Sequence, residues 1–313
     1  MRPLLRGLDY LFLLRPTLFF PVWTMFLAGY VSAVHITRFD SWLEIPGSVN
    51  LWWLLFGITL IAGGTFILNQ LKDISNDEHN GKLFLLADGH ISSKSARVET
   101  ALVIFAGLLI GFSSNLWTGF TFFGLLIVWG YLYNFSPFQW KGHPIMGLVA
   151  NVLGGFFCFA AGWTFSGPVT SQMVIQSLPY LLAFGAVTLL TMIPDRSGDQ
   201  SDGKETFPVR YGVAYTTWLA AAFVVFAFLG GYYLRDWVIT IPAAISMPFF
   251  VQSAVTETES ASLKAIRFSV FFLSMMICAK LPLYFILVLI TFLLARYYYR
   301  ERFDLNYPTF STD

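Results

Sequence analysis

Long runs of apolar residues, almost free of charge, recur along the whole of this 313-residue chain. A helix needs roughly 20 such residues to cross about 30 Å of hydrocarbon. The runs are continuously apolar and do not alternate with polar residues, which favours helices over strands. Runs that suit a membrane span occupy 16–34, 51–71, 98–113, 117–133, 144–165, 174–193, 214–234 and 237–255.

The last apolar region, 265–297, is interrupted by Lys280, Leu281 and Pro282. Because proline disfavours a helical residue before it and cannot continue a helix, we expect a turn here between two short spans. The sequence therefore predicts an all-α integral membrane protein with nine, or with this turn ten, transmembrane helices.

Composition excludes the main alternatives to a membrane protein. Apolar residues make up 56% of the chain and charged residues 12%, against about 25% charged in ordinary globular proteins. Too little polar surface is left for a soluble enzyme, a nucleic-acid-binding protein or a disordered scaffold, and we expect membrane lipids as the surroundings. Cys158 and Cys278 both lie in apolar stretches, so neither a disulfide framework nor a zinc site is indicated.

The basic residues predict the orientation of the chain in the membrane. If the N-terminus is cytoplasmic and each span changes the side, the opposite side holds Arg38 and Arg235, joined by Lys280 if the chain turns there. Arg296, Arg300 and Arg302 are cytoplasmic only if there are ten spans. The remaining cytoplasmic residues are Arg2, Arg6, Arg15, Lys72, Lys82, Lys94, Arg97, Lys141, Arg196, Lys204, Arg210, Lys264 and Arg267.

Acidic residues gather in two short windows, each of which begins where a predicted helix leaves the membrane. Four spans separate the windows, so both open on the cytoplasmic side and the chain has an internal near-repeat. We therefore expect one polytopic domain, 1–313, with two related halves at about 10–135 and 144–255 and C-terminal helices at 265–300. The two windows contain Asp73, Asp77, Glu78 and Asp88, and then Asp195, Asp199, Asp202 and Glu205.

The spacing inside each window indicates a bound cation. Asn69, Asp73 and Asp77 are spaced i, i+4 and i+8, which places them on one face of a helix. Asp195 and Asp199 are again four residues apart. Like charges at this spacing repel one another, and oxygen ligands together with substrate phosphates are what Mg²⁺ prefers. Two facing clusters of this kind could clamp a diphosphate between two metal ions.

These windows resemble the paired motifs of the UbiA-type intramembrane prenyltransferases. Residues 69–77, Asn-Gln-Leu-Lys-Asp-Ile-Ser-Asn-Asp, fit the family's N-x-x-x-D-x-x-x-D motif. Residues 195–212 look like its second motif, D-x-x-G-D followed by G-x-x-T-x-P-V-R-x-G. Arg15-Pro16, the segment 89–92, and the segment 133–137 with Lys141 beyond it also match family features. The resemblance covers about residues 10–255.

The resemblance implies a helical bundle around a central cavity with a polar cap on the cytoplasmic side. It implies Mg²⁺-dependent transfer of an isoprenyl group from a prenyl diphosphate, through an allylic carbocation, to an acceptor that is usually an aromatic ring, as in quinone or chlorophyll biosynthesis. The implied catalytic residues are Asp73, Asp195, Lys141 and Tyr133. The implied diphosphate contacts are Arg15, Lys141, Lys204 and Arg210. The implied metal ligands are Asn69, Asp73, Asp77, Asp195, Asp199 and Asp202.

One departure from the family pattern leaves alternatives open. Many members carry an Arg-Pro pair where this chain has Phe84 and Leu85, and a basic group there would help to hold diphosphate. An intramembrane terpene cyclase, or a transferase that uses a lipid or sugar phosphate, is the alternative within the same superfamily. A transporter is the alternative from another class, but carriers usually place polar groups near the membrane midplane, whereas these acids lie at helix ends.

Overall fold

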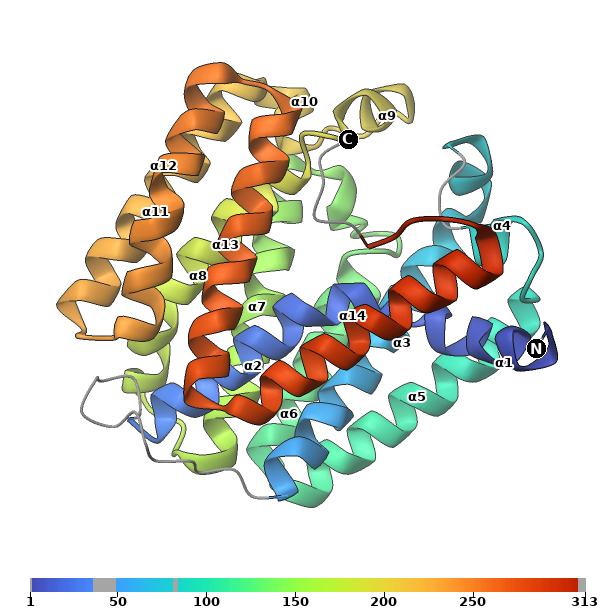
Figure 1. Ribbon diagram of the computed structural model, residues 1–313, viewed down its shortest axis with the longest axis horizontal. Coiled ribbons are helices and arrows are strands. Elements are labelled where there is room, and N and C mark those ends of the chain that lie inside the picture. The colour runs from blue at the N-terminus through green and yellow to red at the C-terminus, as the bar shows by residue number, and fades with distance from the viewer. Residues whose placement is uncertain (1, 36–48, 81–83, 309–313) are drawn as a thin grey trace.

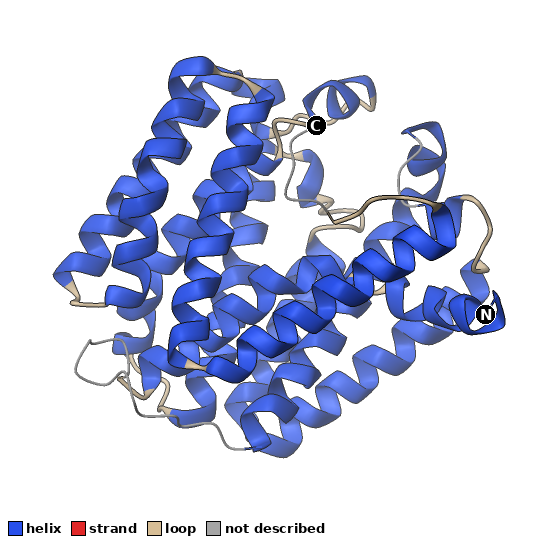
Figure 2. Ribbon diagram, in the orientation of Figure 1, coloured by secondary structure: helices blue, strands red, loops and turns tan. Residues whose placement is uncertain are grey.

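The computed structural model describes residues 2–35, 49–80 and 84–308, of which 2–5, 75–80 and 84 are described by their backbone alone. Every regular element in the described ranges is a helix (Figure 2). In chain order these are α1 (Arg2–Leu13), η1 (Pro16–Leu18), α2 (Phe19–Ala33), α3 (Val49–Asn80), α4 (Phe84–Ala87), α5 (Ser93–Ser114), α6 (Leu116–Leu125), η3 (Leu126–Leu132), η4 (Trp140–Gly142), α7 (Pro144–Ser166), α8 (Ser171–Thr191), α9 (Arg196–Ser201), α10 (Phe207–Tyr211), α11 (Val213–Tyr233), α12 (Trp237–Thr256), α13 (Glu259–Lys280) and α14 (Pro282–Phe303).

The membrane-spanning character of the fold agrees with the sequence. Within the described ranges, nine helices are long and apolar enough to cross a bilayer, and Leu116–Leu132 forms a shorter apolar helix. This matches the expected nine or ten spans. The break predicted near Lys280 is present, but α13 and α14 are each 22 residues long rather than short. α13 begins before the apolar run 265–297, and α14 ends after it. The additional helical turns are polar, so the apolar pattern does not predict them.

Two other predicted spans differ in detail. The span expected at 98–113 begins earlier, at Ser93, because the Ser92 side chain accepts a hydrogen bond from the Ser95 amide and caps the polar first turn of α5. The span expected at 117–133 begins as α6 and then widens into the π-helix η3. A π-helical segment has no separate signature in the apolar pattern, so the sequence could not reveal it.

Close packing at the centre of the bundle depends on glycine. α2 and α7 lie against each other along much of their length. A Cβ atom at Gly29 would collide with the backbone carbonyl of Phe159, and one at Gly162 would collide with the carbonyl of Phe26. These two glycines therefore allow the helix backbones to touch, as small residues do where membrane helices pack.

A break separates the N-terminal helix α1 from α2, although the first candidate span, Arg6–Ala33, includes residues of both helices. Arg15 adopts a left-handed conformation, with φ of 58°, and Pro16 then begins η1. At the other end of the chain, α14 crosses the bundle and ends beside α1 (Figure 1). The described N-terminal and C-terminal helices therefore meet at one end of the molecule.

A cavity of about 1640 Å³ opens among these helices. Its walls come from η1 and α2, from the polar end of α3, and from α8, α13 and α14. Ligand pockets of about 300–1,000 Å³ are typical for drug-sized molecules. The volume therefore exceeds that of a typical ligand pocket, and the predicted central cavity is present.

Candidate active site

The two acidic motifs lie on the wall of this one cavity. Asn69 and Asp73 stand near the end of α3, where the helix leaves its apolar segment. Asp195 and Asp199 follow directly after α8, and Asp199 lies on the short helix α9. All four residues line the cavity, so the chain brings together groups that are more than 100 residues apart in the sequence.

Asp73 is held by a lysine from another part of the chain. Lys141 lies in η4, and its Nζ is 2.6 Å from both carboxylate oxygens of Asp73. The two side chains are only 13% and 18% exposed. Burial lowers the pKa of Lys141, and the hydrogen bond to Asp73 opposes that shift. The pair therefore places a partly desolvated ammonium group at the first motif.

The second motif contains a similar arrangement. Nζ of Lys204 lies 3.1 Å from Oδ2 of Asp202 and 3.5 Å from Oδ1 of Asp199. Burial raises the pKa of Asp199, and the charge of Asp195 adds to this, while Lys204 acts in the opposite direction. Burial alone would lower the pKa of Lys204, but Asp202 and Asp199 raise it overall. Asp202 itself is exposed and stands outside the cavity lining.

Asn69 is oriented by a residue that sequence reasoning did not assign. Nδ2 of Asn134 donates to the backbone carbonyls of Trp129, at 2.8 Å, and Gly130, at 3.3 Å. Both carbonyls belong to the π-helix η3, whose widened turn provides these acceptors. Oδ1 of Asn134 then accepts a hydrogen bond of 2.7 Å from Nδ2 of Asn69. Asn69 uses its amide nitrogen in this bond, so its carbonyl oxygen, Oδ1, remains an acceptor on the cavity wall.

Tyr133 lies between the two motifs. Its side chain is half-buried and lines the cavity, next to Asn151 of α7. Burial raises the pKa of Tyr133, and the charges of Asp199 and Asp73 both act in the same direction. The hydroxyl is therefore a neutral hydrogen-bond donor close to both acidic groups.

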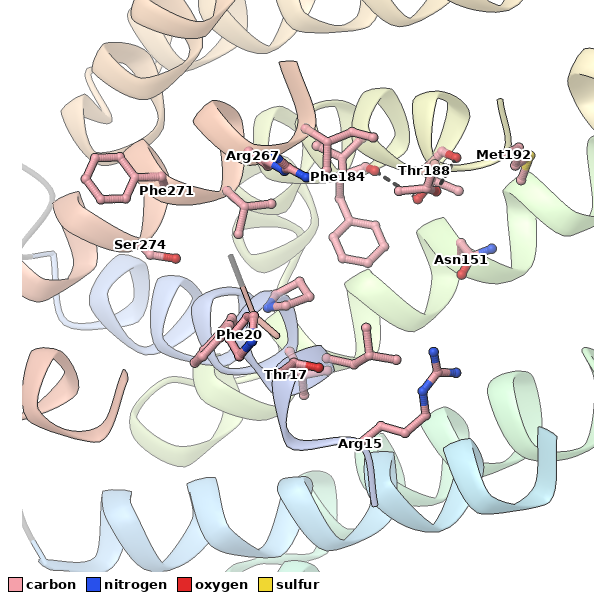
Figure 3. Close-up of a pocket in the computed structure, with 18 of the residues that line it drawn as sticks. Arg15, Thr17, Phe20, Asn151, Phe184, Thr188, Met192, Arg267, Phe271 and Ser274 are labelled. Carbon is pink, nitrogen blue, oxygen red and sulfur yellow. Dashed lines mark hydrogen bonds between the residues drawn. The ribbon is translucent and has the colours of Figure 1, made fainter. Parts of the chain in front are cut away.

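The remaining predicted residues are placed differently from one another. Arg15 projects into the pocket from the junction of α1 and η1 (Figure 3). Arg210 is exposed at the end of α10 and does not line the cavity. Asp77 belongs to α3, but its side chain lies outside the described part of the structure, as does the Lys82 residue near the first motif.

Sequence reasoning also missed two basic residues on α13. Lys264 and Arg267 line the cavity, and Arg267 is half-buried within an apolar helix. Figure 3 shows Arg267 entering the pocket from the wall that carries Phe271 and Ser274. Their i, i+3 spacing near the start of an apolar run was the available signal, because a basic residue inside a span is costly and usually functional.

The residues fit a hard cation by their chemistry. Among the described side chains, no three acidic, histidine or cysteine groups are close enough together to hold a metal ion. Lys141 and Lys204 instead neutralise Asp73 and Asp199. The predicted metal ligands that line the cavity, Asn69, Asp73, Asp195 and Asp199, nevertheless offer carboxylate or amide oxygens, which suit Mg²⁺ and do not suit a soft metal.

Comparison with known proteins identifies the family. A sequence profile of the UbiA prenyltransferase family matches residues 18–276. The chain belongs to this family. The resemblance drawn from the two motifs is therefore confirmed, and α14 lies beyond the matched region.

The curated relatives include a prenyltransferase and a glyceryl phosphate synthase. The chain is 28% identical over 250 residues to 2-acylphloroglucinol 4-prenyltransferase of Humulus lupulus, covering 74% of this chain and 56% of that protein. It is 29% identical over 170 residues to digeranylgeranylglyceryl phosphate synthase of Methanosarcina mazei, covering 52% of this chain and 55% of that protein. The chain thus spans about half the length of the curated relatives it matches.

Solved structures share the fold. A UbiA homolog from Archaeoglobus fulgidus bound to GPP and Mg²⁺ is 18% identical and has a TM-score of 0.63, with 87% of this chain and 99% of that chain covered. A structure of digeranylgeranylglyceryl phosphate synthase in membranes is 19% identical and has a TM-score of 0.63, with 88% and 97% covered. With its many apolar helices, this member of the UbiA family is a multi-pass integral membrane protein.

Proposed function

We propose that this UbiA-family protein transfers an isoprenyl group from a prenyl diphosphate to an acceptor. The observation that carries the proposal is the meeting of Asp73, Asp195 and Asp199 with Lys141 and Lys204 on the wall of one large cavity. Placing like charges together at a partly buried site costs free energy, so acidic loops without a shared ligand are not expected to converge there. Carboxylates and lysines together suit a diphosphate carried with divalent cations.

Each predicted group has a role in this proposal. Asn69, Asp73, Asp195 and Asp199 would hold Mg²⁺, with Asp77 and Asp202 as further ligands. Bound Mg²⁺ would neutralise the charge that grows on the departing diphosphate. Lys141, Lys204 and Arg15 would contact the diphosphate oxygens directly, because fixed cations favour that charge. Arg210, whose side chain is exposed outside the cavity lining, would contact the diphosphate from the rim of the site.

The apolar part of the cavity would protect the allylic cation. Phe66, Trp129 and Phe184 line the wall near the motifs, and aromatic faces attract a cation. Exclusion of water there would prevent hydrolysis of the cation before it reaches the acceptor. Tyr133, between the motifs, would hydrogen-bond to the reacting groups.

The acceptor is proposed to be an aromatic ring. A phosphate-bearing lipid is the second candidate, and the observation that favours it is the presence of two further basic residues, Lys264 and Arg267 of α13, on the cavity wall. The relatives' names point to both kinds of product, since one acts on an acylphloroglucinol and the other is a glyceryl phosphate synthase.

The mouth of the cavity is proposed to face the cytoplasm. The excess of lysine and arginine at the motif end of the helices supports this orientation through the positive-inside rule. The prenyl donor would then place its diphosphate at the cytoplasmic mouth and its hydrocarbon tail among the apolar helices. A single domain with two related halves, 10–135 and 144–255, fits one cavity to which both halves contribute.

The test is prenyl transfer by purified protein. Radiolabelled prenyl diphosphates would be offered with a panel of aromatic and glyceryl phosphate acceptors, with Mg²⁺ or with EDTA. We expect Mg²⁺-dependent transfer that is abolished in Asp73→Asn and Asp195→Asn, while the matched control Glu301→Gln, an exposed change on α14, behaves as wild type. Prenyl transfer that persists in EDTA or in both Asp variants would contradict the proposal. Movement of a labelled compound across the membrane without prenyl transfer would favour a transporter.

A further inference from the structure

The helix α14 lies outside the part of the chain that matches the UbiA family. The family match ends at residue 276, within α13, whereas α14 occupies Pro282–Phe303. Even so, α14 contributes to the wall of the cavity that holds both motifs. What this helix adds to the site therefore lies outside the region that the family profile describes.

One face of α14 forms that wall. The residues concerned are spaced i, i+3, i+4, i+7 and i+8, which is a single stripe along a helix. Every one of them is apolar, and no charged residue of α14 is among the residues that line the cavity. The stripe consists of Phe285, Val288, Leu289, Phe292 and Leu293.

Hydrogen bonds fix α14 at its N-terminal end. The hydroxyl of Tyr284, which is fully buried, lies 2.9 Å from Oγ1 of Thr24 and donates to the backbone carbonyl of Phe20 at 3.3 Å. Both partners belong to α2. The helix therefore begins tied to the first membrane span.

A second set of bonds fixes the C-terminal end. The buried carboxylate of Asp9, on α1, accepts a hydrogen bond of 2.7 Å from Tyr298 and two of 3.1 Å from Arg302. Beyond the helix, the hydroxyl of Tyr307 lies 3.2 Å from Oγ1 of Thr17 in η1. With both ends held, the apolar stripe between them is a fixed wall rather than a freely moving segment.

The stripe lies in the apolar part of the cavity. α13, which packs beside α14, adds Phe268, Phe271 and Met275 to the same lining. Figure 3 shows Phe271, Ser274 and Phe20 on one side of the pocket and Asn151 and Met192 on the other. A ligand whose head lies at the acidic motifs would therefore direct its hydrocarbon part toward α13 and α14.

We propose that α14 forms the end wall of the channel for the donor's prenyl chain, so that Phe285, Leu289 and Phe292 limit the length of chain that the enzyme accepts. The inference rests on the proposed function. Because α14 is held at both ends, removal of side-chain volume from this stripe is the change that would let the channel accept a longer chain. A protein interior resists additional methylene groups when no space exists for them.

The experiment compares donors of different length. For Phe292→Ala and Phe285→Ala, kcat/KM would be measured with C10 and C20 prenyl diphosphates and one common acceptor. We expect the C20-to-C10 ratio to rise about tenfold or more, which corresponds to roughly two additional buried methylene groups. Leu289→Trp should shift the ratio in the opposite direction. Ile286→Ala and Ile290→Ala, exposed positions of the same helix outside the cavity lining, are the matched controls and should leave the ratio unchanged.

The outcomes separate this inference from the proposed function. If wild type transfers prenyl groups and the ratio stays constant in the folded stripe variants, α14 does not set chain length. If wild type transfers nothing, the proposed function fails, and the wall is tested by equilibrium binding of the same two diphosphates to wild type and Phe292→Ala. Equal relative affinities in that binding assay would overturn the inference, and tighter relative binding of the C20 compound by the variant would support it.

Discussion

At the scale of single residues, the site is a set of opposite charges that hold one another in place. Lys141 offsets the negative charge of Asp73 in one ion pair. Lys204 offsets the charges of Asp199 and Asp202 in the same way. Without these lysines, the carboxylates would repel one another at a partly buried surface. The same lysines line the cavity, so in the proposed reaction each one would also contact the diphosphate.

Lys141 is therefore expected to be the most sensitive basic residue. Lys141→Met should lower kcat/KM for the prenyl donor by about 10²-fold or more, the usual cost of removing one donor that stabilises developing negative charge. Lys141→Arg should recover part of the loss, because it keeps the charge but not the geometry. Steady-state kinetics at saturating Mg²⁺ measure both. The exposed Lys94→Met serves as the control, and equal activity of Lys141→Met and this control would refute the role.

Asn134 should act only through Asn69. Asn134→Ala removes the acceptor that holds the Asn69 amide, and we expect about a tenfold loss in kcat/KM for the donor. A double-mutant cycle is the decisive measurement. Asn69→Ala combined with Asn134→Ala should be no worse than Asn69→Ala alone, whereas Asn69→Ala with Asn151→Ala should show additive losses. Additive losses in the first pair would mean that Asn134 has a separate function.

At the scale of elements, the sequence predicted the spans well and their irregularities poorly. The length of apolar runs predicted most helices of the bundle, and the spacing of Asn69 and Asp73 predicted their common face. The π-helix η3 could not be predicted, because its widened turn carries the same apolar residues as an ordinary helix. For that reason Asn134 remained unassigned, and Lys264 and Arg267 were read only as markers of topology until α13 was seen to face the cavity.

The junction between α11 and α12 provides a test of stability at this scale. Asp236 is 1% exposed, caps α12 by accepting from the Val238 amide at 3.1 Å, and accepts from the Tyr180 hydroxyl at 2.8 Å. Burial raises the pKa of Asp236 to about 6. An unfolded aspartate has a pKa of about 3.9, so the folded state binds this proton more tightly. The contribution of Asp236 to stability therefore grows as pH falls from about 7 toward 4.

The matched variant is Asp236→Asn, which keeps a cap for Val238 and a partner for Tyr180 without the charge. We expect the Tm of wild type, relative to this variant, to rise as pH falls from 8 to 5. The difference of about two pKa units corresponds to roughly 3 kcal/mol at most. Thermal unfolding in detergent at several pH values measures it. Parallel curves for the two proteins across that range would show that the buried charge has no effect.

At the scale of the whole molecule, the fold places both motifs and the described ends of the chain at one end of the bundle. Arg302 on α14 is bonded to Asp9 on α1, and Tyr307 reaches Thr17, so the last helix returns to the side where the first begins. The described residues contain nine candidate spans, and a tenth crossing at the shorter apolar helix Leu116–Leu132 would account for this return. The basic residues near the C-terminus then join those of the motif loops on the same side.

This arrangement predicts which positions react from each side of the membrane. Ser201→Cys in the second motif and Glu301→Cys on α14 should both be labelled by a membrane-impermeant maleimide from the cytoplasmic side. Tyr233→Cys, at an 85% exposed position at the far end of α11, should be labelled only from the opposite side. Right-side-out and inverted membrane vesicles supply the two measurements, and wild type controls for the buried Cys158 and Cys278.

If Ser201→Cys and Glu301→Cys react from opposite sides, the chain crosses the membrane an odd number of times between them, and the return of α14 to the motif side is wrong. If all three positions react as expected but from exchanged sides, the arrangement of the helices is supported and only the cytoplasmic orientation is wrong. The orientation was inferred from the positive-inside rule, and helix packing does not determine it.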